Sequence, residues 1–156
     1  MIAIDQATSS GVAFTTTDYD ILVFETKGTP IELFKVVNQI AMDYNHYLVL
    51  LEKMVYFPTK GKGNRTVAMT SLMERTGYLR YRLIEAYLTV QSLHTPSCRK
   101  KLGFEGKENN KRSVHKYFQQ FDKRITDNCS DALVLLLSQF SNWKDFKITY
   151  IDEDKL

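Results

Sequence analysis

Long apolar runs, closely spaced cysteines and a strong net charge are all missing from this 156-residue sequence. No stretch approaches the roughly 20 apolar residues that span a bilayer, and the first residues are typical of a strand instead of a signal sequence, so we expect no membrane association. The only cysteines, Cys98 and Cys129, match no metal-ligand spacing and indicate reduced thiols in a cytoplasm. A net charge of +3 is too small to indicate a nucleic-acid partner by itself.

The composition is that of an ordinary soluble globular protein, with 44% hydrophobic and 25% charged residues. This length suits one domain that buries its own core, so a single domain over residues 1–156 is predicted. The basic residues are unevenly placed. Residues 60–82 hold six of them against one acid, and residues 99–116 hold seven against two, whereas the first 52 residues are net acidic.

The pattern of apolar residues predicts a mixed α/β fold. Three strands joined by short links, at about residues 1–5, 12–17 and 21–24, imply an antiparallel meander. The segment Thr29-Pro30-Ile31-Glu32 has the residues of a helix start, and this helix should run to about residue 46. Further along, we expect strands at 47–52 and 89–93, helices at 64–88, 111–123 and 127–140, and a helix start at Thr95-Pro96. Residues 146–151 are left open as a terminal strand or an ordered tail.

Three acidic residues stand beside apolar segments, where an ionised carboxylate loses hydration. Asp5 ends the first strand, Glu52 ends the strand at 47–52, and Asp131 precedes the apolar run from Ala132 to Leu137. Such carboxylates persist when they pair with a cation or bind a metal ion. Two divalent ions roughly 4 Å apart prefer carboxylate oxygens and promote cleavage of phosphodiester bonds, so the three acids predict one shared metal site.

These residues resemble the RuvC-like Holliday junction resolvases of the RNase H-like nuclease superfamily, particularly their small phage versions. The similar segments are the first strand from Ile2 to Gly11, Leu50-Leu51-Glu52, the helix start Ser130-Asp131-Ala132-Leu133, and the basic stretch from Thr95-Pro96 to Val114. The resemblance covers most of the chain. It implies an RNase H-like mixed five-stranded sheet, with a three-strand antiparallel meander plus parallel strands, flanked by helices.

The resemblance also implies a function and a ligand set. The protein would be a magnesium-dependent endonuclease, with Mn²⁺ as a substitute, that uses two ions per site to cut four-way and other branched DNA in recombination and repair. Asp5 would bridge both ions, while Glu52 and Asp131 would each hold one. The family places an aspartate or histidine three residues before Asp131, where this chain has Asn128, so the fourth ligand is either Asn128 or Asp127.

DNA contacts are expected from both basic segments. Lys111 corresponds to a late lysine of the family and would lie at the scissile phosphate, although a surface lysine at a helix start is an equally open reading. Tyr56 and Phe57 are expected either to stack on unpaired bases or to belong to the core. Backbone phosphates would be contacted by Lys60, Lys62, Arg65, Lys100, Lys101, Lys107, Lys111 and Arg112.

A twofold homodimer suits the two symmetric cuts that a four-way junction needs, and the wide apolar stripe of the helix at 64–88 is its expected surface. If a phage encodes the protein, it would work in the host cytoplasm; the use of a branch-migration motor stays open. Two rival functions also stay open. One is an RNase H-type nuclease acting on RNA in hybrids, and the other is a catalytically weak or inactive module that binds branched DNA.

Overall fold

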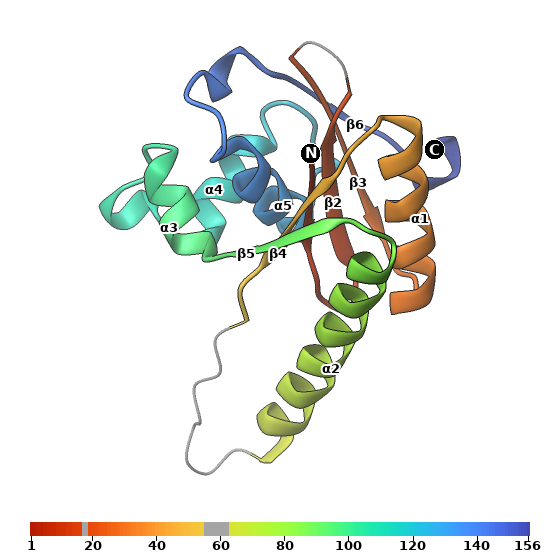
Figure 1. The fold of residues 1–156 in the computed structure, drawn as a ribbon. Coiled ribbons are helices and arrows are strands. Elements are labelled where there is room, and N and C mark those ends of the chain that lie inside the picture. Colours follow the sequence, from red (N-terminus) through yellow and green to blue (C-terminus); the bar gives the residue numbers. More distant parts are fainter. Residues whose placement is uncertain (17–18, 55–62) are drawn as a thin grey trace.

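A six-stranded mixed sheet forms the centre of the molecule (Figure 1). The computed structural model describes residues 1–16, 19–54 and 63–156, with side chains in the last range from Met69 onward. The strand order is β5-β4-β1-β2-β3-β6. Among the described strands, β2 alone runs antiparallel to its neighbours, β1 and β3, and the other pairs are parallel. The strands are β1 (Ile2–Asp5), β2 (Ser10–Thr15), β3 (Asp20–Thr26), β4 (Leu48–Glu52), β5 (Thr89–Leu93) and β6 (Lys147–Tyr150).

The meander and the parallel strands are as expected, but the predicted count of five strands was wrong. The sixth strand, β6, pairs in parallel with β3, so the C-terminal segment is a strand and not a tail. Its sequence signal is weak because the strand has four residues and only Ile148 is buried, with Lys147 and Thr149 exposed. An edge strand with one buried side chain offers little alternation to detect.

In the described parts of the chain, five α-helices connect and follow these strands. They are α1 (Pro30–Asp43), α2 (Gly63–Glu85), α3 (Thr95–Lys101), α4 (Lys111–Phe118) and α5 (Asp127–Leu137), with short 3-10 helices at Gly106–Glu108, Trp143–Asp145 and Glu153–Lys155. The start of α1 is a capping box, since the Thr29 hydroxyl accepts from the Glu32 N–H and the Glu32 carboxylate accepts from the Thr29 N–H. Helices α4 and α5 end earlier than predicted, at residues 118 and 137 instead of 123 and 140.

The helices cover the sheet on both sides, with α1 and α2 on one face and α3, α4 and α5 on the other (Figure 1). Alternation along β1 follows from this arrangement: Ile2 and Ile4 pack in the core under α1 and α2, whereas Ala3 packs under α5. Helix α5 is buried along its length from Cys129 to Leu137. It therefore lies at the centre of its layer, directly on the strands.

Helix α2 keeps much of its apolar surface exposed. Of its described side chains, Leu79 and Leu83 are buried against the sheet, and the part nearer its N-terminus extends away from the body (Figure 1). Its exposed large side chains are Met73, Tyr78, Tyr81 and Ile84. The predicted wide stripe is thus present, but only one edge of it serves the core. Among the residues described, no helix has the length and apolarity needed to cross a bilayer.

Candidate functional site

Asp5 and Glu52 end two neighbouring parallel strands. In the register of β1 and β4, Ile4 lies opposite Leu51, so the two acids are the next residues along each strand. Ala3 and Leu50 belong to the core under α5, and the alternation of each strand therefore turns Asp5 and Glu52 to that same side. Asp5 is only 4% exposed, which makes it a buried carboxyl group at the end of the strand.

A hydrogen bond joins the Asp5 and Glu52 carboxyl groups. Burial raises the pKa of Asp5 to about 9, with further contributions from the hydrogen bond and charge of Glu52 and from the charge of Asp131. Glu52 is held from the other side, because the Thr95 hydroxyl at the start of α3 donates to its Oε1 at 2.6 Å. Asp5 thus keeps its proton at neutral pH, within the hydrogen bond that it shares with Glu52.

Asp131 approaches this pair from α5. Its carboxylate is buried and accepts from two cations: Arg99 Nη2 of α3 lies 2.6 Å from Oδ1, and Lys111 Nζ of α4 lies 3.0 Å from Oδ2. Burial alone would lower the pKa of Lys111, but the carboxylates of Asp131, Asp5 and Asp127 outweigh it and leave the pKa raised. Lys111 is therefore a charged lysine at the carboxylate cluster.

The chemistry of these donors fits a divalent metal ion. Hard cations prefer carboxylate oxygens, and the pKa of Asp5 is raised first by burial and then by Glu52 and Asp131, effects that a bound cation would oppose. Within the described part of the chain, however, no three acidic, histidine or cysteine side chains already form a metal-binding group. Asp131 instead faces Arg99 and Lys111, so it would have to exchange these partners to bind an ion.

The two candidates for the fourth ligand lie in different surroundings. The Asn128 amide nitrogen donates to the Ser9 carbonyl at 2.8 Å and to Glu25 Oε1 at 3.1 Å. Asp127 has a side chain that is 57% exposed, and its Oδ1 lies 3.4 Å from His115 Nδ1. Asn128 is therefore tied to the sheet, whereas Asp127 faces solvent beside α4.

The described basic residues of the expected DNA surface belong to elements in the same layer as α5. They are exposed residues of α3, α4 and the 3-10 helix between them: Lys100, Lys101, Lys107, Lys111 and Arg112. Only the backbone of Arg65 is described, within α2. Four expected contact residues fall outside the described residues altogether: Tyr56, Phe57, Lys60 and Lys62.

Three residues of the site were not assigned a role from the sequence. Arg99 was counted in a basic segment, yet its side chain is buried against Asp131. Thr95 was recognised only as part of a helix start, and Glu25, the residue after the predicted strand at 21–24, was given no role. The proline after Thr95 signals a helix at this point, but no sequence pattern indicates that its hydroxyl reaches Glu52, 43 residues away.

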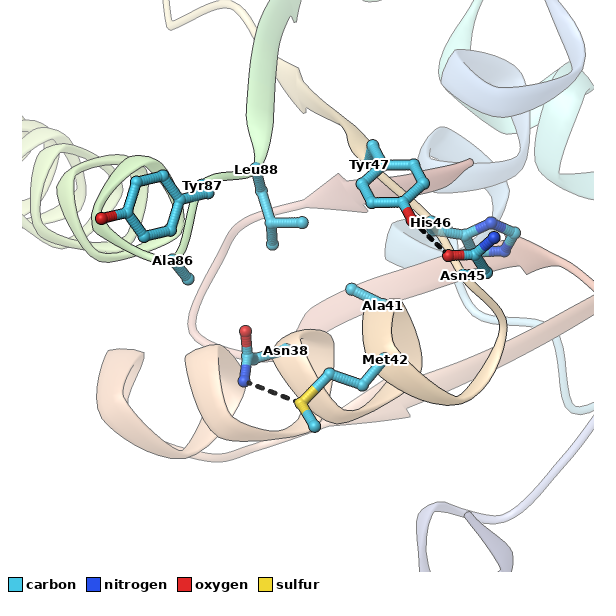
Figure 2. Close-up of a pocket in the computed structure, with 9 residues that line it drawn as sticks. All are labelled: Asn38, Ala41, Met42, Asn45, His46, Tyr47, Ala86, Tyr87 and Leu88. Atoms are coloured by element: carbon cyan, nitrogen blue, oxygen red, sulfur yellow. Dashed lines mark hydrogen bonds between the residues drawn. The ribbon is translucent and has the colours of Figure 1, made fainter.

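A hollow of about 330 Å³ lies at the opposite end of the strands, between the ends of α1 and α2 and the starts of β4 and β5 (Figure 2). The described residues that line it include Met42, His46, Tyr47 and Tyr87, and none of them is an acid, a lysine or an arginine. Because the acids end β1 and β4 while this hollow adjoins the beginning of β4, the two sites are separated by the length of the strands. The hollow therefore lies away from the carboxylates.

Comparison with solved structures identifies the fold; no family model and no curated protein matches the sequence. Thermus thermophilus RuvC in complex with a Holliday junction substrate is 12% identical, with a TM-score of 0.63 over 88% of this chain and 91% of that one. A second Thermus thermophilus RuvC structure is 14% identical, with a TM-score of 0.55 over 88% and 92%. The yeast mitochondrial Holliday junction resolvase Ydc2 is 14% identical, with a TM-score of 0.47 over 92% and 78%. The RuvC-like fold expected from the sequence is confirmed.

Proposed function

We propose that this protein is a metal-dependent endonuclease that cuts four-way junctions and other branched DNA. The observation that carries the proposal is the convergence of Asp5, Glu52 and Asp131, from β1, β4 and α5, beside the charged Lys111. In a RuvC-like fold, this is the chemistry needed to bind cations next to a phosphodiester. The junction in the similar Thermus thermophilus RuvC complex supports the choice of branched DNA as substrate.

Asp5, Glu52 and Asp131 would hold the metal ions, with Asn128 or Asp127 completing the set. Bound magnesium, or manganese in its place, lowers the pKa of water and stabilises the leaving oxygen of the phosphate. Asp5 must release its proton to become a ligand, because its pKa is about 9. The Thr95 hydroxyl fixes the position of the Glu52 carboxyl group by a hydrogen bond. Lys111, which pairs with Asp131, would place its positive charge beside a phosphate bound at the metal ions.

Two surfaces complete the proposed enzyme. Basic residues of α3 and α4, together with Lys60, Lys62 and Arg65 from the segment after β4, would contact backbone phosphates, while Tyr56 and Phe57 would stack on unpaired bases. The exposed apolar residues of α2, Tyr78, Tyr81 and Ile84, would pair two copies of the chain. A twofold dimer presents two sites related by symmetry, as paired cuts in a junction require.

The decisive experiment compares wild type with Asp5→Asn on a labelled synthetic four-way junction in magnesium. Asparagine keeps the shape of the side chain but removes the ligand charge, so we expect cleavage to fall at least about 100-fold while junction binding changes less than about threefold. Equal cutting by both proteins would show that Asp5 is not a ligand needed for cleavage. An RNA–DNA hybrid in the same panel tests the RNase H-type alternative, which wins if the hybrid is cut faster than the junction.

A non-cleaving module that binds branched DNA is a second candidate. The observation that favours it is the double engagement of the Asn128 amide with Ser9 and Glu25, since Asn128 brings no charge to a metal ion. This candidate predicts tight junction binding by wild type without cleavage in either magnesium or manganese. Cleavage that Asp5→Asn abolishes would reject it.

A further inference from the structure

Glu25 brings a carboxylate to the first turn of α5 that the proposed reaction does not yet use. On the sheet, Glu25 of β3 lies opposite Gly11 of β2, and Gly11 in turn lies opposite Asp5 of β1. Its Oε1 accepts hydrogen bonds from the Thr126 hydroxyl and from the Asn128 amide, both at 3.1 Å. One carboxylate oxygen thus holds both the cap and the first turn of α5.

The partners of Asn128 determine how its amide is oriented. The Ser9 carbonyl and the Glu25 carboxylate can only accept hydrogen bonds, so the amide NH₂ must be the group that faces them. The amide oxygen Oδ1 is then directed away from Glu25. A neutral amide oxygen is an acceptable ligand for a hard divalent cation.

Close packing against Gly11 also fixes the position of the first turn of α5. A Cβ added to Gly11 would lie 2.2 Å from the carbonyl carbon and oxygen of Asn128 and 2.5 Å from the Cys129 nitrogen. The first turn of α5 therefore rests directly on β2, on the strand between those of Asp5 and Glu25. Asp131 lies about one turn further along α5, so its position depends on this contact between α5 and β2.

We propose that Glu25 is a positioning residue, which acts through Thr126 and Asn128 to seat α5 and to present the Asn128 oxygen as a neutral metal ligand. The inference rests on the proposed function and deepens it, because it selects Asn128 over Asp127. It also explains why a neutral side chain suits position 128. An aspartate there would set two carboxylates against each other and leave the Ser9 carbonyl without its donor.

The hydrogen bond between Asn128 and Glu25 can be reversed by exchanging the amide and the carboxylate between the two positions. This exchange is the test. In Asn128→Asp the carboxylates repel, so we expect Mn²⁺ affinity and junction cleavage to fall about 10-fold or more and the melting temperature to drop. In the double variant Glu25→Gln/Asn128→Asp, the amide introduced at position 25 can donate to the carboxylate introduced at position 128. We expect this variant to recover most of the loss in all three measurements. Glu25→Gln alone keeps an acceptor oxygen for both donors, so it should lose less than Asn128→Asp in all three measurements.

The control is Asp20→Asn, which removes a carboxylate at the other end of the same strand and should change none of the three measurements. Asn128→Asp with undiminished Mn²⁺ affinity and stability would overturn the inference, as would a double variant no better than the single one. A large loss in Glu25→Gln would also overturn it, because the charge of Glu25 would then act directly on the ion. Mn²⁺ binding and unfolding are measurable in a protein that cuts no junction, so failure of the proposed function is distinguishable from failure of this inference.

Discussion

At the residue scale, Asp131 depends on partners that lie far away in the sequence. Its buried carboxylate pairs with Arg99, which has a side chain only 10% exposed, at 2.6 Å. A buried ion pair is a weak source of net stability, but removing one partner leaves an uncompensated charge inside the protein. Lys111 can offset part of that charge because it lies 3.0 Å from the other carboxylate oxygen.

We therefore expect Arg99→Met to lower the free energy of unfolding by about 3 kcal/mol. Urea denaturation measures the change, and the double variant Arg99→Met/Asp131→Asn should regain part of it because no buried charge remains. Lys155→Met is the control: it breaks a pair with Asp152 whose side chains are 68% and 46% exposed, and should cost about 1 kcal/mol or less. Equal losses for the two single variants would show that burial of the Arg99–Asp131 pair does not increase the cost of removing one partner.

The raised pKa of Asp5 predicts how stability depends on pH. An aspartate titrates near 3.8 in the unfolded chain but at about 9 in the folded protein, so the folded state alone carries the proton between these values. The free energy of unfolding must then fall as the pH rises across this window. In Asp5→Asn the side chain is always neutral and this contribution disappears.

Thermal unfolding from pH 5 to pH 9 in the presence of a chelator tests this prediction. The melting temperature of Asp5→Asn should exceed that of wild type by roughly 2–8 °C at pH 8, and the two should converge toward pH 5. Magnesium at pH 8 should raise the melting temperature of wild type more than that of the variant. Parallel pH curves would mean that Asp5 titrates normally.

At the element scale, the contact between β2 and α5 sets the geometry of the site. Gly11 has no space for a side chain, because a Cβ would overlap the backbone of Asn128. Gly11→Ala must therefore lift the start of α5 or bend β2. We expect it to destabilise the protein by about 2 kcal/mol or more and to abolish junction cleavage.

The matched control for Gly11→Ala is Gly77→Ala, in the middle of α2. A Cβ at Gly77 meets nothing within 4 Å, and alanine is the better helix former by about 1 kcal/mol. Gly77→Ala should raise stability and leave cleavage unchanged, as measured by urea denaturation and junction cleavage. If both alanine variants behaved alike, contact with α5 would not be the reason for glycine at position 11.

The strands and helices also show which parts of the fold the sequence patterns could predict. β1 and β4 were predictable because their apolar runs are dense, and the order of the strands was enough to bring Asp5 and Glu52 together. The pairing of Glu25 with Asn128, 103 residues apart, was not. This pairing depends on the strand register and on where a helix packs against the sheet, and periodicity within one segment cannot specify either. The same is true of Arg99 and Asp131.

At the scale of the whole molecule, the two layers of helices carry different surface chemistry. Exposed lysines and arginines gather on α3, α4 and the turn between them, on the side of the sheet that holds the carboxylates. The opposite layer presents the apolar residues of α2, including Tyr81 and Ile84. The DNA-contacting side chains proposed on α3 and α4 thus lie in a different layer from the apolar side chains proposed for the dimer, so these two groups can be altered separately.

Charge on the α3–α4 side predicts a steep salt dependence of junction binding. Each phosphate neutralised by a lysine or arginine releases condensed counterions, so the logarithm of the binding constant should fall with the logarithm of salt concentration with a slope of about −0.9 per contact. The five contacts expected on this side, from Lys100, Lys101, Lys107, Lys111 and Arg112, contribute about −4.5 to the slope per protomer. The variant Lys100→Ala/Lys101→Ala should reduce its magnitude by about 2. Lys35→Ala, on α1 in the opposite layer, is the control and should leave it unchanged. A titration of junction binding between about 50 and about 300 mM salt measures all three slopes, and equal slopes for the two variants would place the DNA on another surface.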